Sequence, residues 1–184
     1  MRDGHMRTAI SKAPEALVAH VVINERPYTE VLTADYMIVN PISNGMFKSG
    51  ATFDDENDWD EWREGTVNNY VLPGKGVVGP SDDPAAPGEV LIGGETLEYP
   101  HAGILNTLAF LTRYPSTATN RNRARARWTY KFFLGIDIER LAPRTTDPDA
   151  LADTNNPTMN NPNCTVCHEV HDPVAGAFHN YGHD

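Results

Sequence analysis

The sequence predicts a mainly α-helical, loop-rich chain with a small β-hairpin. Apolar residues recur at helical spacing in residues 1–42 and again in residues 99–184, as they do in helices that bury one face. Residues 43–98 are punctuated by Gly, Pro, Asp and Asn, and the whole chain holds 14 Gly and 14 Pro, which favours turns and long connections. With 184 residues, 40% of them hydrophobic, the chain can bury the core of one domain.

Four segments carry the helical spacing, and each has a boundary signal. Ser11 is a candidate N-cap, Pro41 and Pro115 close the second and third segments, and Gly135 stops the fourth. We also expect two short strands to pair as the hairpin and residues 136–163 to form an irregular, proline-rich connection. The expected helices are Ser11–Asn24, Thr29–Val39, Ala102–Arg113 and Thr119–Leu134, and the expected strands are Thr66–Leu72 and Glu89–Ile92.

The charge of the chain limits its partners. A net charge of −10 and a pI near 5.0 argue against a nucleic-acid binder. The apolar runs are too short for a membrane-spanning helix. An acidic run lies in the loop-rich part, and we interpret it as solvated surface, because it lacks the central Gly and the closing Glu of a calcium loop. The run comprises Asp54, Asp55, Glu56, Asp58, Asp60, Glu61 and Glu64.

The motif Cys164-Thr165-Val166-Cys167-His168 is the most specific chemical signal in the chain. Haem has two vinyl groups on neighbouring pyrroles, and two thiols separated by two residues on one helical turn can form thioethers with both. The residue directly after the second cysteine then lies beneath the ring, where an imidazole can bind iron. The motif therefore predicts one covalent haem c, held by Cys164 and Cys167, with His168 as the proximal iron ligand.

Three other interpretations of this motif are weaker. A redox dithiol would follow a strand, whereas here the residues before Cys164 are Asn160-Asn161-Pro162-Asn163. A zinc site that recruits His171 would need four ligands within eight residues to spread into a tetrahedron. A structural disulfide would leave His168 without a role. The sequence favours haem attachment.

The haem motif and five further stretches resemble a known family. The haem domain is carried by Pro100–Leu105, Thr119–Arg123, Phe132–Gly135 and Asp172–Phe178, and an upstream module by Leu17–Pro41. Together they resemble the c-type cytochrome domain proteins of unknown function that are abundant in planctomycetes. In that family a proline-rich link leads to Cys-x-x-Cys-His-x-x-Met-Asp-Pro. This chain has His171 where the family has Met, and His101 where it has Arg.

The resemblance implies a mainly α, loop-rich monohaem cytochrome c domain. We expect one haem-binding domain over residues 1–184, with a helical part at 1–42, a loop-rich acidic insertion at 43–98 and a haem-attachment part at 99–184. The resemblance also implies a place at the C-terminal end of a longer secreted polypeptide. We expect such a fragment because residue 1 already enters a predicted helix and Met1–His5 precede no signal-like apolar stretch.

The sixth iron ligand is left open by the motif. His101 is the first candidate, because it precedes a helix that the resemblance places near the haem. His171 follows His168 by three residues, so it faces the same side of the ring and is a poor opposite ligand; it could contact a haem of a neighbouring chain. The other candidates are His20, His179, His183, Met37, Met46 and Met159.

A basic run offers partners for the haem propionates. Guanidinium groups bind carboxylates through two parallel hydrogen bonds, so Arg121, Arg123, Arg125 and Arg127 are candidate propionate contacts. Residues four apart share a helix face, which pairs Arg121 with Arg125 and Arg123 with Arg127. An exposed helix surface is the alternative interpretation of this run.

These features predict an electron-transfer protein rather than an enzyme. Haem is attached to this motif outside the cytoplasm, so we expect a periplasmic or extracellular, cell-surface location. The expected partners are a redox protein or other subunits of a larger assembly. The alternatives are a haem enzyme of the peroxidase or oxidase type, with an open iron position, and an accessory subunit in which haem has a structural role.

Overall fold

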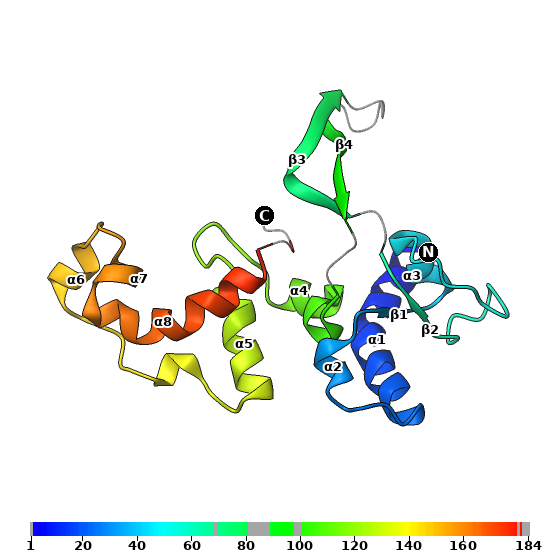
Figure 1. Cartoon of the computed structure of the whole chain (residues 1–184), viewed down its shortest axis with the longest axis horizontal. Coiled ribbons are helices and arrows are strands. Elements are labelled where there is room, and N and C mark those ends of the chain that lie inside the picture. The colour runs from blue at the N-terminus through cyan, green and yellow to red at the C-terminus, as the bar shows by residue number, and fades with distance from the viewer. Residues whose placement is uncertain (1, 68–69, 81–88, 98–100, 180, 182–184) are drawn as a thin grey trace. The chain divides into compact units, whose positions relative to one another are not determined.

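The computed structural model describes residues 2–67, 70–80, 89–97, 101–179 and 181. Helices predominate, as predicted, and the chain divides into two compact units, Met1–Ala109 and Phe110–Asp184. The boundary between these units falls inside helix α4 (Leu108–Arg113), whereas we expected the haem-attachment part to begin at residue 99. Figure 1 labels the elements of both units.

The first unit is built around its N-terminal helix. Helix α1 (Arg2–Ile23) starts nine residues earlier than Ser11 and ends one residue before Asn24. One face of α1 packs on the short helix α2 (Glu30–Thr33) and on strand β1 (Met37–Val39). This packing buries a small apolar core, which stabilises the unit by removing apolar surface from water. The buried core residues are Leu17, Val21, Val31, Ala34, Tyr36 and Ile38.

The predicted helix Thr29–Val39 is wrong in its second half. It ends at Thr33, and β1 pairs antiparallel with β2 (Arg63–Gly65), with Ile38 opposite Glu64. The β-branched residues Ile38 and Val39 suit a strand better than a helix. The pairing partner lies 24 to 28 residues further along the chain, so a local pattern could not reveal it.

A further helix, α3 (Pro41–Phe47), lies in the segment expected to be loop. Its N-terminus is a capping box: the Asn40 side chain accepts from the Ser43 amide at 3.0 Å, and the Ser43 hydroxyl accepts from the Asn40 amide at 2.9 Å. Pro41 occupies the first helical position, where its missing N–H is not needed. The proline that was expected to mark a boundary therefore starts a helix.

The predicted hairpin is present with different bounds. Strands β3 (Tyr70–Pro80) and β4 (Glu89–Leu97) pair antiparallel, with Tyr70 opposite Leu97 and Pro80 opposite Glu89. The register shifts twice between these ends. β3 begins later and runs further than the expected Thr66–Leu72, and β4 runs five residues beyond Ile92.

The predicted helix Ala102–Arg113 is divided into η1 (Gly103–Asn106) and α4. Gly103 has a φ of +53°, and its amide donates to the Ala34 carbonyl at 3.1 Å. A Cβ at this position would lie 2.2 Å from the Val31 carbonyl oxygen. Only glycine allows this close approach of the two backbones.

The second unit carries the haem motif on its last helix. Helix α5 (Arg123–Phe133) begins four residues later than Thr119, because Arg121 and Asn122 adopt left-handed backbone angles, and it ends just before Gly135, which also has a positive φ. The connection expected to be irregular contains η2 (Ile138–Arg140), α6 (Pro148–Ala152) and α7 (Pro157–Asn160). Helix α8 (Pro162–Ala177) follows and packs on α5 and α7.

No helix within the described ranges combines the length and the apolar character that crossing a membrane requires. This agrees with the prediction from the sequence.

Candidate functional site

The haem motif occupies the first two turns of α8. Asn161 caps this helix by accepting from the Asn163 amide at 3.0 Å, and Pro162 takes the first helical position. Cys164, Cys167 and His168 then follow at spacings that place them on one face of the helix. Both cysteines are partly buried free thiols, and the Cys167 thiol lies 3.7 Å from the carbonyl oxygen of Ile138.

Both thiols and the imidazole line one cleft of about 430 Å³. Its other walls are largely apolar and come from η2, the connection that follows it, α5 and α8. A cleft of this size and character suits an apolar, planar group, and the donor set of two thiols and one imidazole is the one that haem c requires. The residues therefore fit a covalent haem. The apolar walls are Ile138, Ala142, Pro143, Leu151 and Val166.

His168 is held by a carboxylate one turn further along α8. Its Nδ1 lies 3.0 and 3.1 Å from the two carboxylate oxygens of Asp172. Arg123 from α5 binds the same carboxylate through two hydrogen bonds, of 2.8 Å from Nε and 2.9 Å from Nη2. Burial alone would raise the pKa of Asp172, but the hydrogen bonds from Arg123 and His168 outweigh it and hold that pKa below its usual range.

The four arginines of the basic run have separate surroundings. Arg121 and Arg123 line a cleft with His168, and Arg123 also lines the cleft of the thiols. Arg125 is buried and donates to the carbonyls of Tyr114 and Leu111 and to the Asn122 side chain. Arg127 binds Asp137 at 3.1 and 3.3 Å, and this hydrogen bond raises the pKa of Arg127.

Of the two shared helix faces expected for these arginines, the structure has one, because Arg123 and Arg127 lie four residues apart in α5. Arg121 precedes α5, so it cannot pair with Arg125 across a turn. Neither Arg125 nor Arg127 lines the clefts that His168 lines. Of the predicted propionate contacts, Arg121 and Arg123 are the two that the structure brings to His168.

His101 and His168 belong to different units. The Nε2 atom of His101 accepts a hydrogen bond from the Val67 amide at 3.2 Å, so iron binding through this atom would require that bond to break. Its assignment as the sixth ligand stays a prediction.

The other ligand candidates are distributed over both units. In the second unit, Nε2 of His171 donates to the Arg123 carbonyl at 2.6 Å, and burial lowers the pKa of His171. The His179 ring donates to the Gly176 carbonyl at 2.8 Å. Met159 is 77% exposed and lines a cleft with His168. His20, Met37 and Met46 belong to the first unit, and His183 lies outside the described residues.

Two features of the site were not predicted. The first is the apolar wall that residues 138–151 form opposite the thiols, a segment expected to be an irregular connection. The second is Asp172, which follows His168 by four residues, so helical spacing could have identified it. Arg144 also lines the thiol cleft, and it binds Glu139 at 3.1 Å.

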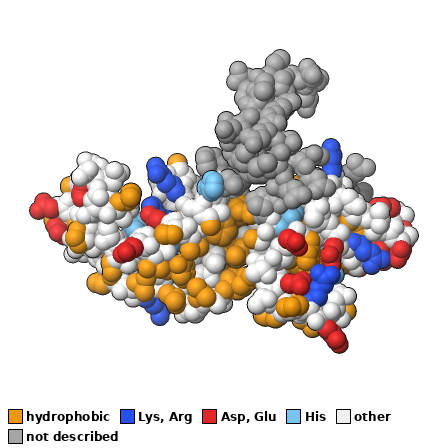
Figure 2. Space-filling view, viewed as in Figure 1, with side chains coloured by type: hydrophobic (Ala, Val, Ile, Leu, Met, Phe, Trp, Pro, Cys, Tyr) orange, Lys and Arg blue, Asp and Glu red, His pale blue; other side chains and the backbone are white. Residues whose placement is uncertain are grey.

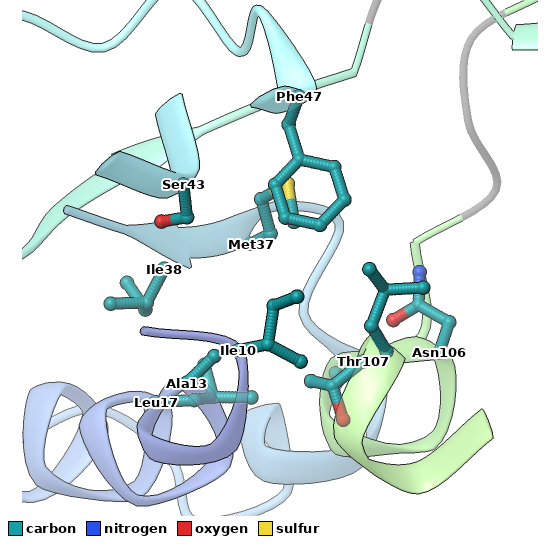
Figure 3. Close-up of a pocket in the computed structure, with 11 residues that line it drawn as sticks. Ile10, Ala13, Leu17, Met37, Ile38, Ser43, Phe47, Asn106 and Thr107 are labelled. Atoms are coloured by element: carbon teal, nitrogen blue, oxygen red, sulfur yellow. The ribbon is translucent and has the colours of Figure 1, made fainter. Parts of the chain in front are cut away.

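Two further hollows differ from the thiol cleft. An open cleft of about 870 Å³ also has His168 in its wall but neither cysteine. In the first unit, a cavity of about 20 Å³ lies between α1, β1, α3 and the segment of η1 and the two residues after it (Figure 3), with room for about one water molecule. No titratable side chain lines this small cavity, which is far too small for a haem.

The acidic run is organised by Glu61. The amides of Asp54 and Asp55 donate to its carboxylate at 3.0 and 3.1 Å, and Arg63 also binds it. These backbone hydrogen bonds lower the pKa of Glu61. Across the part of the chain that the structure describes, no group of three or more His, Cys, Asp or Glu side chains is arranged to hold a metal ion.

Comparison of the chain with protein-family models, curated proteins and solved structures finds no match. The resemblance to planctomycete c-type cytochrome domain proteins therefore stays a prediction from the residues that carry it.

Proposed function

We propose that this chain carries one haem c, bound covalently through Cys164 and Cys167 with His168 on the iron, and that it transfers electrons. The observation that carries the proposal is the shared cleft: both thiols and the imidazole line one largely apolar hollow of about 430 Å³. All three residues of the motif line this cleft, and His168 also lines the open cleft of about 870 Å³. The proposal thus rests on the arrangement as well as on the motif.

Each part of the cleft has a task in this proposal. The two thiols fix the ring against α8, and the apolar walls exclude water from its faces, which keeps the reorganisation of the site small. His168 offers Nε2, because its Nδ1 faces the Asp172 carboxylate. Arg121 remains a candidate propionate contact, and Arg123 remains one through Nη1, because its Nε and Nη2 atoms bind Asp172. When bound, haem supplies an iron couple that accepts and releases one electron.

We further propose that the chain works in the periplasm or at the cell surface, as a subunit of a larger assembly or with a redox protein partner. Exposed hydrophobic side chains gather over α5 and the residues just after it (Figure 2). Phe132 is 55% and Leu134 62% exposed, and Ile136 and Leu141 are exposed nearby. Exposed apolar side chains in one neighbourhood are typical of surfaces that contact another protein.

The test is production of the chain with an export signal in a bacterial host that attaches c-type haem. Intact mass should show one added haem that survives acid–acetone extraction, and Cys164→Ala/Cys167→Ala should show none. Recovery of wild-type protein with free thiols and no added haem from a competent host would overturn the proposal.

The spectrum then separates electron transfer from catalysis. A six-coordinate, low-spin haem supports electron transfer, because both axial positions are filled. A five-coordinate, high-spin haem would instead support the haem-enzyme alternative.

A further inference from the structure

The side chain that faces the motif histidine is fixed from two helices. Asp172 presents both carboxylate oxygens to Nδ1 of His168, at 3.0 and 3.1 Å. Arg123 binds the same two oxygens from α5 at 2.8 and 2.9 Å. Such a two-point contact fixes the plane of the carboxylate as well as its position.

Arg123 is itself held in place. Its backbone carbonyl accepts from the His171 ring at 2.6 Å, and nearby the Tyr130 hydroxyl donates to the Val170 carbonyl at 3.2 Å. Both contacts join α5 to α8 around Asp172. A turn of the carboxylate away from His168 would therefore break both of its hydrogen bonds from Arg123.

This arrangement determines which nitrogen of His168 can bind iron. An ionised carboxylate only accepts hydrogen bonds, so the proton of a neutral His168 ring lies on Nδ1 and the lone pair lies on Nε2. A carboxylate on the far nitrogen also makes an imidazole a stronger electron donor, as it does for histidines that bind other metals.

We propose that Asp172, oriented by Arg123, is the positioning residue of the iron-binding imidazole: it fixes the tautomer of His168 and lowers the reduction potential of the haem. This inference rests on the proposed haem attachment. It adds a residue outside the Cys-x-x-Cys-His motif that sets the electronic properties of the site.

The experiment compares haem-loaded variants by their midpoint potential and by the iron–histidine stretching frequency in resonance Raman spectra. The Raman spectra are recorded on the ferrous protein just after photolysis of bound carbon monoxide, when His168 is the one axial ligand. Asp172→Asn should raise the midpoint potential and lower the stretching frequency. An amide oxygen accepts a weaker hydrogen bond from Nδ1 than a carboxylate does, so the imidazole becomes a weaker electron donor to the iron. A tenfold change in the relative stability of the two oxidation states corresponds to ~59 mV for one electron, and we expect a shift of about that size.

Three further variants make the test specific. Glu169→Gln removes an equal charge from the residue next to His168 and should shift the potential much less. Asp172→Glu keeps a carboxylate and should restore most of the wild-type values. Arg123→Lys keeps the charge but loses the two-point contact, so its potential should rise less than that of Asp172→Asn.

The outcomes separate this inference from the proposed function. Wild-type protein without covalent haem would overturn the proposed function. Covalent haem in the wild type, with Asp172→Asn shifted no more than Glu169→Gln, would overturn the positioning role alone. If Asp172→Asn fails to load haem, the comparison of Asp172→Glu with Arg123→Lys replaces it. A midpoint potential and a stretching frequency in Arg123→Lys that equal those of the wild type would overturn the inference.

Discussion

Arg125 illustrates how one residue of a charged run can serve the core. It is 4% exposed, and it donates to the carbonyls of Tyr114 and Leu111 and to the side chain of Asn122. Arg125→Met would leave these buried acceptors without their donors, so we expect a loss of about 3 kcal/mol in unfolding free energy. Hydrogen exchange of the α5 amides measures this loss.

The matched control is Arg121→Met, whose side chain is exposed. It should change the stability by less than about 0.5 kcal/mol. Haem loading should be normal in the Arg125 variant, because Arg125 lines neither cleft of His168. A loss of haem without a loss of stability would instead support a role at the propionates.

Gly103 and Gly135 allow a second comparison of single residues. Both have positive φ angles, of +53° and +69°. A Cβ at Gly103 would meet the Val31 carbonyl at 2.2 Å, whereas at Gly135 it would meet nothing within 4 Å. Gly135→Ala should therefore cost about 1–2 kcal/mol, the strain of a left-handed residue. Gly103→Ala should cost more, and equal losses in urea unfolding experiments would contradict the close approach.

The acidic segment between α3 and β2 has a pH-dependent element in Glu61. Because its folded-state pKa is lowered by the amides of Asp54 and Asp55, its contribution to stability is present above the unfolded-state pKa of about 4.3. It is lost as the pH falls through the lower, folded-state value. We expect the NMR titration of the Glu61 carboxyl to have a midpoint below 4.3.

Glu61→Gln should remove this acid dependence, so the local order of residues 54–63 should no longer change between pH 5 and pH 3. Glu56→Gln is the control, because Glu56 is exposed and its substitution removes the same charge. If the acid transition persists unchanged in Glu61→Gln, it belongs to another titrating group.

Elements with local signals were the ones that the sequence could predict. The spacing of Leu17 and Val21 marks α1, and Gly135 ends α5, because both signals act within a few residues. Strand β1 was missed because its partner β2 is distant in the chain. The helices that start at Pro41, Pro148 and Pro157 were missed because proline was interpreted as a break, although it also suits the first helical position.

In the candidate site too, the sequence could predict the residues with a local signal but not the contacts between distant parts of the chain. Cys164, Cys167 and His168 form a contiguous motif, so the sequence alone identifies them. The contact between Arg123 and Asp172 joins residues 49 positions apart, and only the packing of α5 on α8 brings them together. The cleft wall around Ile138 depends likewise on tertiary structure.

The two units differ in charge as well as in sequence. Residues 1–109 contain 7 Lys and Arg against 17 Asp and Glu, whereas residues 110–184 contain 8 of each. The net charge of −10 therefore belongs to the first unit, and the unit with the haem motif is neutral.

Two compact units should also respond separately to haem. A covalent haem stays attached when the chain unfolds, but its burial in the cleft belongs to the folded state, and that burial stabilises the cooperative unit that encloses the ring. We therefore expect Cys164→Ala/Cys167→Ala, compared with haem-loaded protein, to lose hydrogen-exchange protection in α5 and α8 but not in α1 and β1.

Glu64→Gln in the haem-loaded protein should show the opposite pattern. Glu64 binds His20 at 2.8 Å and also binds Arg26, so it joins β2 to α1 and to the residues that follow α1. Loss of these ion pairs should lower the hydrogen-exchange protection of α1 and leave that of α8 unchanged, because His20 and Arg26 both lie in the first unit. Equal losses in both units, from either variant, would show that the chain unfolds as one cooperative domain, as the sequence first suggested.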